Sequence, residues 1–264
     1  MNNELRFALY AIKKNIQSSA ELRTSFLMNV VGMAINNSSF IILWVFFVES
    51  VGVIGGWTAA DVVGLEGFAA LSYGIVFSMG FGIRKLPDYI SSGAFDRFML
   101  APKNLLMRIV TSAFGVSAVG DVVFGIVCLT IYAFLIQATL AQIALILGAV
   151  VLSTIVFLSL SIILFSSSFF FTDSTSVTNG LFDLFLTPTL FHGGAFQGAL
   201  RFVYTFLIPS LLVAALPVEI VKDLSFSKLA LVAGLGLFWF FFSLKLFQVV
   251  VKKYESSNFM TFGS

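Results

Sequence analysis

Charged residues are scarce in this chain of 264 residues. Asp, Glu, Lys and Arg together make up 11% of it, whereas soluble domains carry about a quarter. Hydrophobic residues make up 59%, and the mean hydropathy is +1.02. This scarcity of charge excludes an ordinary soluble domain. It predicts an all-α integral membrane protein with a single transmembrane domain over residues 1–264.

Metal-ligating and nucleophilic residues are nearly absent. Cys128 is the one cysteine, so no disulfide can form within the chain, and His192 is the one histidine, so no metal site is predicted. No G-x-x-x-x-G-K-[ST] phosphate loop occurs, so this chain is not expected to bind ATP in that way. One histidine and scattered acids do not form a convergent catalytic set, which argues against an enzyme.

Long apolar runs dominate the chain. A crossing needs about 20 residues, and the runs predict six spans with both termini on one side. An amphipathic helix over residues 1–23 is expected to lie on the membrane surface, although a simple positively charged lead-in stays open. The six spans cover residues 24–48, 67–83 (or from 59), 105–136, 143–171, 179–190 and 228–251.

Two of these spans carry polar stripes at helical spacing. Such side chains must be hidden from lipid by protein or water. Tight helix packing is the favoured interpretation, and a substrate path stays open. The stripes are Ser25, Asn29, Gly32, Asn36 and Ser39 on the first span, and Asn179, Asp183 and Thr187 on the fifth.

Acidic and small residues inside the spans give further expectations. Asp121 is expected to bond to a Ser or Asn of a neighbouring helix, with a functional role as the alternative. An Asp183–Lys245 ion pair is a hypothesis, and Glu66 is placed in the loop before the second span. A ridge of Ala70, Gly74, Ser78 and Gly82 predicts a close helix approach.

Proline and glycine interrupt the fifth hydrophobic stretch. Pro188, the Gly193–Gly194 pair, Gly198 and Pro209 disturb helix hydrogen bonding in an otherwise apolar sequence. Residues 191–217 are therefore predicted to form a re-entrant pair of short helices between spans five and six. His192, at its mouth, is expected to pack or cap rather than to bind a ligand.

The distribution of Lys and Arg predicts the orientation. Cytoplasmic loops collect these residues. One side holds both termini and residues 84–104, and it receives every Lys and Arg except Arg201, Lys222 and Lys228. That side is therefore expected to be cytoplasmic.

Residues 84–104 form the longest charged segment in the middle of the chain. Within it, Phe95, Phe98 and Met99 fall on one side of a short amphipathic helix, with Asp96 and Arg97 beside them. This pattern is typical of a helix that lies at the membrane surface and presses one face against a partner. We call residues 84–104 the coupling segment.

The coupling segment resembles the signature of export permeases of the second ABC-transporter type. Ile90, Gly93, Asp96, Leu100 and Pro102 match it, the last two one residue from the family's spacing. Residues 188–217 are similar to the region of the fifth span and re-entrant helices in the six-span subgroup, whose chains have about this length. The Gly193–Gly194 pair departs from that pattern.

The resemblance implies a transmembrane permease subunit of an ATP-driven exporter. Two copies of an ABC ATPase subunit would carry ATP and Mg, and a second permease, identical or homologous, would complete the path with spans one, two and five at the interface. Phe95 and Phe98 would seat in an apolar groove of the ATPase, and Asp96 and Arg97 would set the register by ion pairs. The residues implied in coupling are Ile90, Gly93, Phe95, Asp96, Arg97, Phe98, Leu100 and Pro102.

The class of substrate is predicted only broadly. Few charges along the spans favour a lipid-like, drug-like or other amphipathic substrate exported across a bacterial cytoplasmic membrane, with membrane lipids as neighbours and no nucleic-acid partner. The alternatives are a secondary transporter or channel, or a non-transporting assembly subunit. A secondary transporter would be expected to have internal repeats and ionisable pairs within the membrane. No repeat is evident between the halves, and Asp121 and Asp183 are the only acids predicted deep in the spans, which argues against this alternative.

Overall fold

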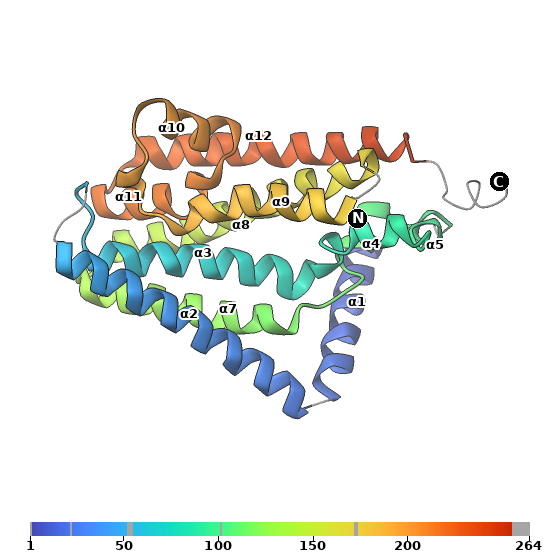
Figure 1. The fold of residues 1–264 in the computed structure, drawn as a ribbon, viewed down its shortest axis with the longest axis horizontal. Coiled ribbons are helices and arrows are strands. Elements are labelled where there is room, and N and C mark those ends of the chain that lie inside the picture. The colour runs from blue at the N-terminus through green and yellow to red at the C-terminus, as the bar shows by residue number, and fades with distance from the viewer. Residues whose placement is uncertain (1, 22, 52–54, 101, 172–173, 255–264) are drawn as a thin grey trace.

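The computed structural model describes residues 2–21, 23–51, 55–100, 102–171 and 174–254. These residues form helices and connecting turns without strands, which confirms the all-α prediction. Five helical stretches are long and apolar enough to cross a membrane within the described residues. They are built on α2 (Arg23–Val51), α3 (Ala59–Gly80), α7 (Val116–Leu135), α8 (Leu140–Ser166) and α12 (Phe226–Val251), which run along the long axis of the molecule (Figure 1).

Helix α3 lies at the centre of this bundle, and most of its residues are buried. It begins at a capping box, in which Thr58 Oγ1 accepts a hydrogen bond from Asp61 N and the Asp61 carboxylate accepts one from Thr58 N. The early start places Glu66 two turns inside the helix. The prediction that Glu66 belongs to a loop is therefore wrong.

Small residues bring α3 close to α7. A Cβ atom added to Gly74 would lie 2.6 Å from Val122 N, and one added to Gly125 would lie 2.6 Å from Leu71 N. Only glycine fits where two helix backbones approach so closely. The predicted close approach along the ridge that contains Gly74 is confirmed.

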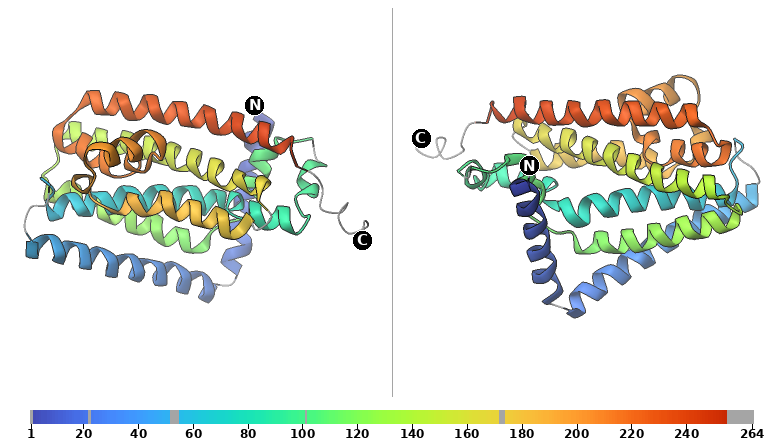
Figure 2. Two further views of the ribbon diagram at one scale, coloured as in Figure 1. Left: turned by 45° about the horizontal axis from the view of Figure 1, so that its top comes forward. Right: turned by 180° about the vertical axis from the view of Figure 1, so that it is seen from behind.

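One end of the bundle carries α1 and the coupling segment. Helix α1 runs across the axis of the long helices (Figures 1 and 2), as an interfacial helix would, and its place on a membrane surface stays a prediction. The elements at this end are α1 (Asn2–Glu21), η1 (Phe81–Ile83), α4 (Leu86–Ser91), α5 (Asp96–Met99) and α6 (Leu105–Val110).

The third span is shorter than predicted. Helix α6 ends at Val110, and α7 begins only at Val116. Between them the chain turns, and Gly115 N donates a hydrogen bond to Phe77 O at 3.1 Å. The expected continuous helix over residues 105–136 is therefore wrong, because apolar composition alone did not reveal this break.

The fifth span begins five residues earlier than predicted and ends as predicted at Leu190. Helix α9 (Ser174–Leu186) has 13 residues and passes into the 3-10 turn η3 (Thr187–Leu190), of which Pro188 is the second residue. That helix is too short for a full crossing. The six full spans of the prediction are therefore five in the described residues, with α9 as a short sixth segment.

Short helices follow η3 and turn the chain back toward the bundle (Figure 1). This is the course that a re-entrant pair over residues 191–217 would take, and its depth in a membrane stays a prediction. The last of these helices is mostly buried. The elements are η4 (Gly193–Ala195), α10 (Gly198–Phe202), the π-turn η5 (Val203–Leu207), η6 (Ser210–Leu212) and α11 (Ala215–Asp223), and the 3-10 turn η2 (Ser167–Phe170) lies earlier, after α8.

The α3–α7 contact yields the first prediction. Gly74→Ala is expected to push α3 and α7 apart and to lower the stability of the chain by about 1–3 kcal/mol, because the added methyl group meets backbone atoms. Thermal unfolding of the purified protein in detergent measures this. Gly148→Ala is the matched control, since a Cβ at that helix position meets nothing within 4 Å. Equal melting temperatures for the two variants would contradict the close contact.

Candidate functional site

The coupling segment folds into a tight helical turn at one end of the bundle. Gly93 has φ +71°, a left-handed conformation that glycine adopts without strain. It lets the chain reverse between α4 and α5, so that Phe95 N donates a hydrogen bond to Tyr89 O at 2.9 Å. The glycine of the signature is therefore required by the backbone.

Phe95 lies inside the chain rather than on its surface. Its side chain is 0% exposed, with its ring centroid 5.2 Å from Phe169 and 4.6 Å from Tyr254. The Tyr254 hydroxyl donates to Asp96 Oδ1 at 3.0 Å. A buried ring cannot seat in a partner protein, so the role expected of Phe95 as a docking anchor is wrong. The short helix instead uses this ring to attach itself to the bundle.

Phe98 is half-buried and also serves the chain's own packing. Its ring lies 5.0 Å from Tyr89, and the Arg108 guanidinium lies 5.6 Å from its centroid. Arg108 also donates to Phe98 O. Ile90 is half-buried against the core.

The outward side of the coupling segment presents other residues. Leu100 is 86% exposed and Met99 50%, and Arg97 and Pro102 are exposed beside them. We call Arg97, Met99, Leu100 and Pro102 the exposed tip. Two apolar side chains next to a guanidinium have the composition of a small protein-binding surface.

Helix α1 is tied to the loops that flank α6. Glu4 Oε2 accepts a hydrogen bond from Asn104 N at 3.2 Å, and Lys103 Nζ lies 3.9 Å from Glu4 Oε1. Farther along α1, Asn15 Nδ2 donates to Thr111 O at 2.9 Å. The coupling segment and α1 therefore form one connected unit.

Both predicted polar stripes lie on the surface of the chain. On α2 the stripe side chains bond locally: Asn29 Nδ2 donates to Ser25 O at 2.8 Å, and Ser39 Oγ donates to Ile35 O at 3.0 Å. By contrast α3 is buried within the chain, so the expectation that span two lies at a subunit interface is wrong. The exposed stripe residues are Ser25, Asn29, Gly32, Asn36, Ser39, Asn179, Asp183 and Thr187.

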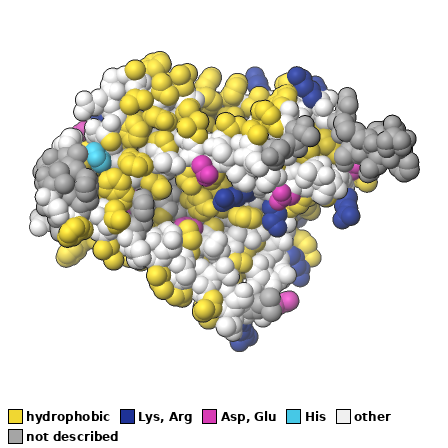
Figure 3. Space-filling view, in the orientation of Figure 1, with side chains coloured by type: hydrophobic (Ala, Val, Ile, Leu, Met, Phe, Trp, Pro, Cys, Tyr) yellow, Lys and Arg dark blue, Asp and Glu magenta, His cyan; other side chains and the backbone are white. Residues whose placement is uncertain are grey.

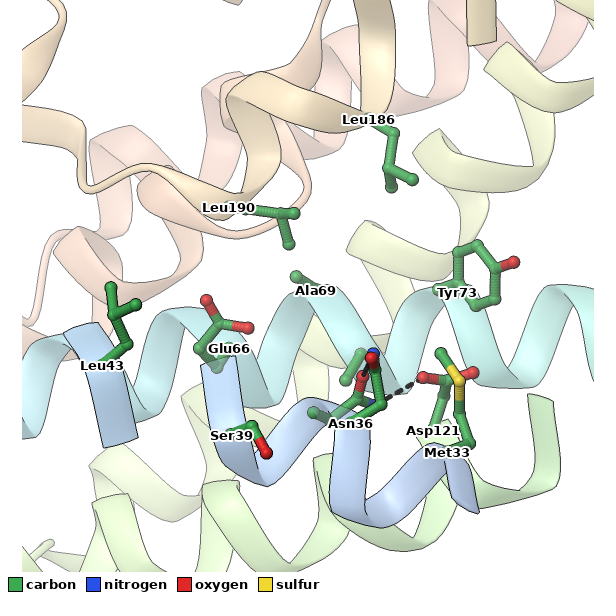
Figure 4. Close-up of a pocket in the computed structure, with 12 residues that line it drawn as sticks. Met33, Asn36, Ser39, Leu43, Glu66, Ala69, Tyr73, Asp121, Leu186 and Leu190 are labelled. Atoms are coloured by element: carbon green, nitrogen blue, oxygen red, sulfur yellow. Dashed lines mark hydrogen bonds between the residues drawn. The ribbon is translucent and has the colours of Figure 1, made fainter. Parts of the chain in front are cut away.

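A cavity of about 490 Å³ lies between α2, α3, α7 and the α9–η3 segment (Figure 4). Asn36 and Ser39 of the first stripe line it, with Glu66 and Tyr73 from α3 and Asp121 from α7. The remaining wall is mostly apolar, and it consists of Met33, Asn37, Leu43, Ala69, Ala70, Leu186 and Leu190.

Two buried acids face this cavity. Asp121 is 3% exposed and its Oδ1 accepts a hydrogen bond from Asn37 Nδ2 at 2.6 Å, which confirms the predicted bond to a neighbouring helix. Glu66 is 5% exposed. Sequence reasoning missed Glu66, although the Thr58–Asp61 capping pattern could have shown that the helix begins before it.

A family model described as ABC-2 family transporter protein matches residues 34–258. The chain belongs to this family. No curated protein matches the chain, and no solved structure does. The chain is therefore a multi-pass membrane protein and the transport component of an ABC transporter rather than its catalytic part, which implies an ABC ATPase as partner.

The cations at the far end of this ABC-2 permease are held by acids. Arg201 Nη2 lies 2.8 Å from Glu219 Oε2, and Lys228 Nζ lies 2.9 Å from the same oxygen and 2.6 Å from Asp223 Oδ2. Lys222 Nζ lies 2.7 Å from Asp61 Oδ2. Arg201, Lys222 and Lys228, assigned to the non-cytoplasmic side, are thus all neutralised locally. In Figure 3 most visible Lys and Arg lie toward the opposite end.

Three further residues for which the sequence made predictions are His192, Asp183 and Lys245. His192 is buried, with its ring 6.1 Å from Trp57 and 6.4 Å from Trp44, as expected for a packing residue. Asp183 and Lys245 are both exposed, and no ion pair of the described residues joins them. The hypothesis of an Asp183–Lys245 pair is wrong.

The ion-pair cluster of the permease yields the second prediction. Glu219→Gln removes the charge that binds Arg201 and Lys228, and it is expected to lower stability by about 2 kcal/mol. Amide exchange in residues 193–212 is expected to rise, because Arg201 then loses its acid partner. Hydrogen–deuterium exchange measures the effect. Glu21→Gln, at an exposed position, serves as the control. Unchanged exchange of residues 193–212 in Glu219→Gln would contradict a stabilising role of the ion-pair cluster.

Proposed function

We propose that the chain is the permease subunit of an ATP-driven exporter in a bacterial cytoplasmic membrane, with both termini in the cytoplasm. Family membership carries this proposal. The distribution of charge supports the orientation, since most Lys and Arg residues belong to the predicted cytoplasmic side, which holds α1 and the coupling segment. A lipid-like, drug-like or other amphipathic molecule is the proposed substrate.

The exposed tip is the proposed docking site for the ATPase, which carries ATP and Mg in two copies. Leu100 and Met99 would enter an apolar groove of the ATPase, and Arg97 would pair with an acid beside it. This replaces Phe95 as the anchor while it keeps the coupling role of the segment. Ile90, Gly93, Asp96 and Phe98 would hold the tip in shape, and Pro102 would end it.

Movement of the tip would reach the bundle through three contacts. Thr175 Oγ1 of α9 donates to Asp88 Oδ1 at 3.3 Å, which joins α4 to α9. Phe95 joins α5 to the end of α8 through Phe169. Glu4 joins the loop before α6 to α1. Closure of the ATPase pair would thus displace helices on both sides of the cavity.

A second permease subunit, identical or homologous, is the proposed cover for the two polar stripes. In lipid, exposed side chains such as Asn29, Asn36 and Asp183 are unfavourable unless protein or water covers them. The stripes lie on α2 and on α9–η3, which flank the cavity. A subunit packed there would enclose the path between two chains.

Docking by the exposed tip yields the third prediction. Leu100→Asp is expected to weaken association with the ATPase by about 2 kcal/mol while the permease stays folded, because this side chain contacts solvent rather than the core. Phe95→Ala is expected instead to destabilise the permease by about 3–5 kcal/mol. The measurements are the amount of ABC ATPase that co-purifies with the tagged permease, and its melting temperature.

Leu140→Asp is the control for docking. Leu140 is 84% exposed at the first residue of α8, so this change adds the same charge at a position outside the tip. Normal co-purification with Leu100→Asp, or an equal loss with Leu140→Asp, would contradict docking at the tip.

The second subunit yields the fourth prediction. A photo-reactive benzoylphenylalanine at position 29 is expected to cross-link to a second permease in native membranes, whether identical or homologous. The same group in place of Phe238, an exposed residue of α12, is expected to react mainly with lipid. Mass spectrometry of the products identifies the neighbour. Permease cross-links that form from position 238 but not from position 29 would refute the stripe interface.

A further inference from the structure

We propose that the cavity between α2, α3, α7 and α9–η3 binds an amphipathic organic cation, with its positive group near Glu66 and Asp121 and its apolar body against the remaining wall. This inference rests on the proposed function and narrows its substrate class.

Each acid keeps an oxygen atom without a partner. Glu66 Oε1 and Asp121 Oδ2 are both buried and accept no hydrogen bond from the described residues. Buried polar atoms are almost always paired in folded proteins, and an unpaired carboxylate oxygen is costly. Both residues line the same cavity from different helices, so a polar or charged group bound there could lie beside the two acids.

No cation of the described chain fills this role. None of the described residues that line the cavity is Lys, Arg or His. Arg84 bonds to a residue of the wall, since its Nη1 donates to Tyr73 Oη at 2.7 Å, but its guanidinium lies over the rings of Phe77 and Phe182. The described residues that line the cavity thus supply no positive charge beside Glu66 and Asp121, and a cation at this position would come from the ligand.

The rest of the wall sets the shape of that ligand. Met33, Leu43, Leu186 and Leu190 offer apolar surface, and Tyr73 adds the edge of an aromatic ring. A volume of about 490 Å³ lies within the range of small-molecule sites. A hydrated inorganic cation would leave this apolar surface uncovered, whereas a lipophilic amine, quaternary ammonium or phosphonium would cover it.

The cavity reaches the surface of the chain on the side where the second permease is proposed to pack, so a bound ligand would lie between the two subunits. Asn36, Ser39 and Leu43 form its outer edge on α2 and are exposed on the surface of the chain. The two acids on the wall would then favour a cationic ligand over anionic and neutral membrane lipids.

The probe is tetraphenylphosphonium, and isothermal titration of the full permease, purified in detergent, measures its binding. Glu66→Gln and Asp121→Asn are each expected to weaken binding by about tenfold or more, because each removes one charge next to the cation. Glu66→Asp keeps the charge and is expected to retain most of the affinity. Glu21→Gln, with an exposed acid outside the cavity, is expected to bind as the native chain does.

A parallel titration uses tetraphenylborate, an anion of matching size and shape. Binding of the anion as tight as that of the cation would overturn the proposal. The proposal would also be overturned if Glu66→Gln and Asp121→Asn bound the cation as tightly as the native chain does. It would be overturned as well if Glu66→Asp lost as much affinity for the cation as Glu66→Gln. Size-exclusion profiles and melting temperatures establish that each variant is folded.

Co-purification of the ABC ATPase is measured on the same preparations. An ATPase that co-purifies with a permease unable to bind tetraphenylphosphonium would overturn the cation site and leave the proposed function standing. A permease that binds the cation but co-purifies with no ATPase would overturn the proposed function and leave the cation site standing.

Discussion

The close contact between α3 and α7 is the constraint on which the rest of the structure depends. At Gly74 and Gly125 the two helix backbones lie so close that a Cβ atom on either glycine would come within 2.6 Å of a backbone nitrogen of the other helix. The contact leaves α3 little surface outside the chain, and it brings Glu66 of α3 and Asp121 of α7 to one cavity. Larger residues at the contact would separate the two helices that carry these acids.

The same helix connects the cavity to the coupling segment. Helix α3 continues through η1 into α4, so Glu66 lies on one nearly continuous helical path that ends at Ser91, before the turn at Gly93 that leads to the exposed tip. Phe95 then attaches the tip to the end of α8 rather than to another protein. A force on Leu100 would therefore reach α3 through the turn at Gly93 and α4, and it would reach α8 through the packed ring of Phe95.

Much of this fold could be predicted from the sequence, because hydrophobic runs and small-residue spacing act locally. The central helices, the Gly74 ridge and the hydrogen bond of Asp121 followed from such patterns. The end of the fifth span followed from Pro188, but its start did not, because residues before 179 are polar and read as a turn although α9 begins at Ser174. The break after α6 depends on a backbone contact between Gly115 and Phe77, which are far apart in sequence.

The candidate site was less predictable for a related reason. Phe95 and Leu100 are both apolar residues of one short segment, and only the tertiary fold decides that the first is buried and the second exposed. Glu66 was missed because a carboxylate near the end of an apolar run looks like the end of a span. Its burial becomes apparent only when the helix start at Thr58 is recognised.

Charge at the two ends of the molecule and charge in its centre have different physical roles. At the far end each of Arg201, Lys222 and Lys228 has an acid partner within 3 Å, so those ions hold the short helices in place. At the centre Glu66 and Asp121 have no cationic partner among the described residues that line the cavity. A bundle that pairs the cations at its far end and leaves two acids on the wall of an apolar cavity is suited to hold a positive charge that the described lining residues do not supply.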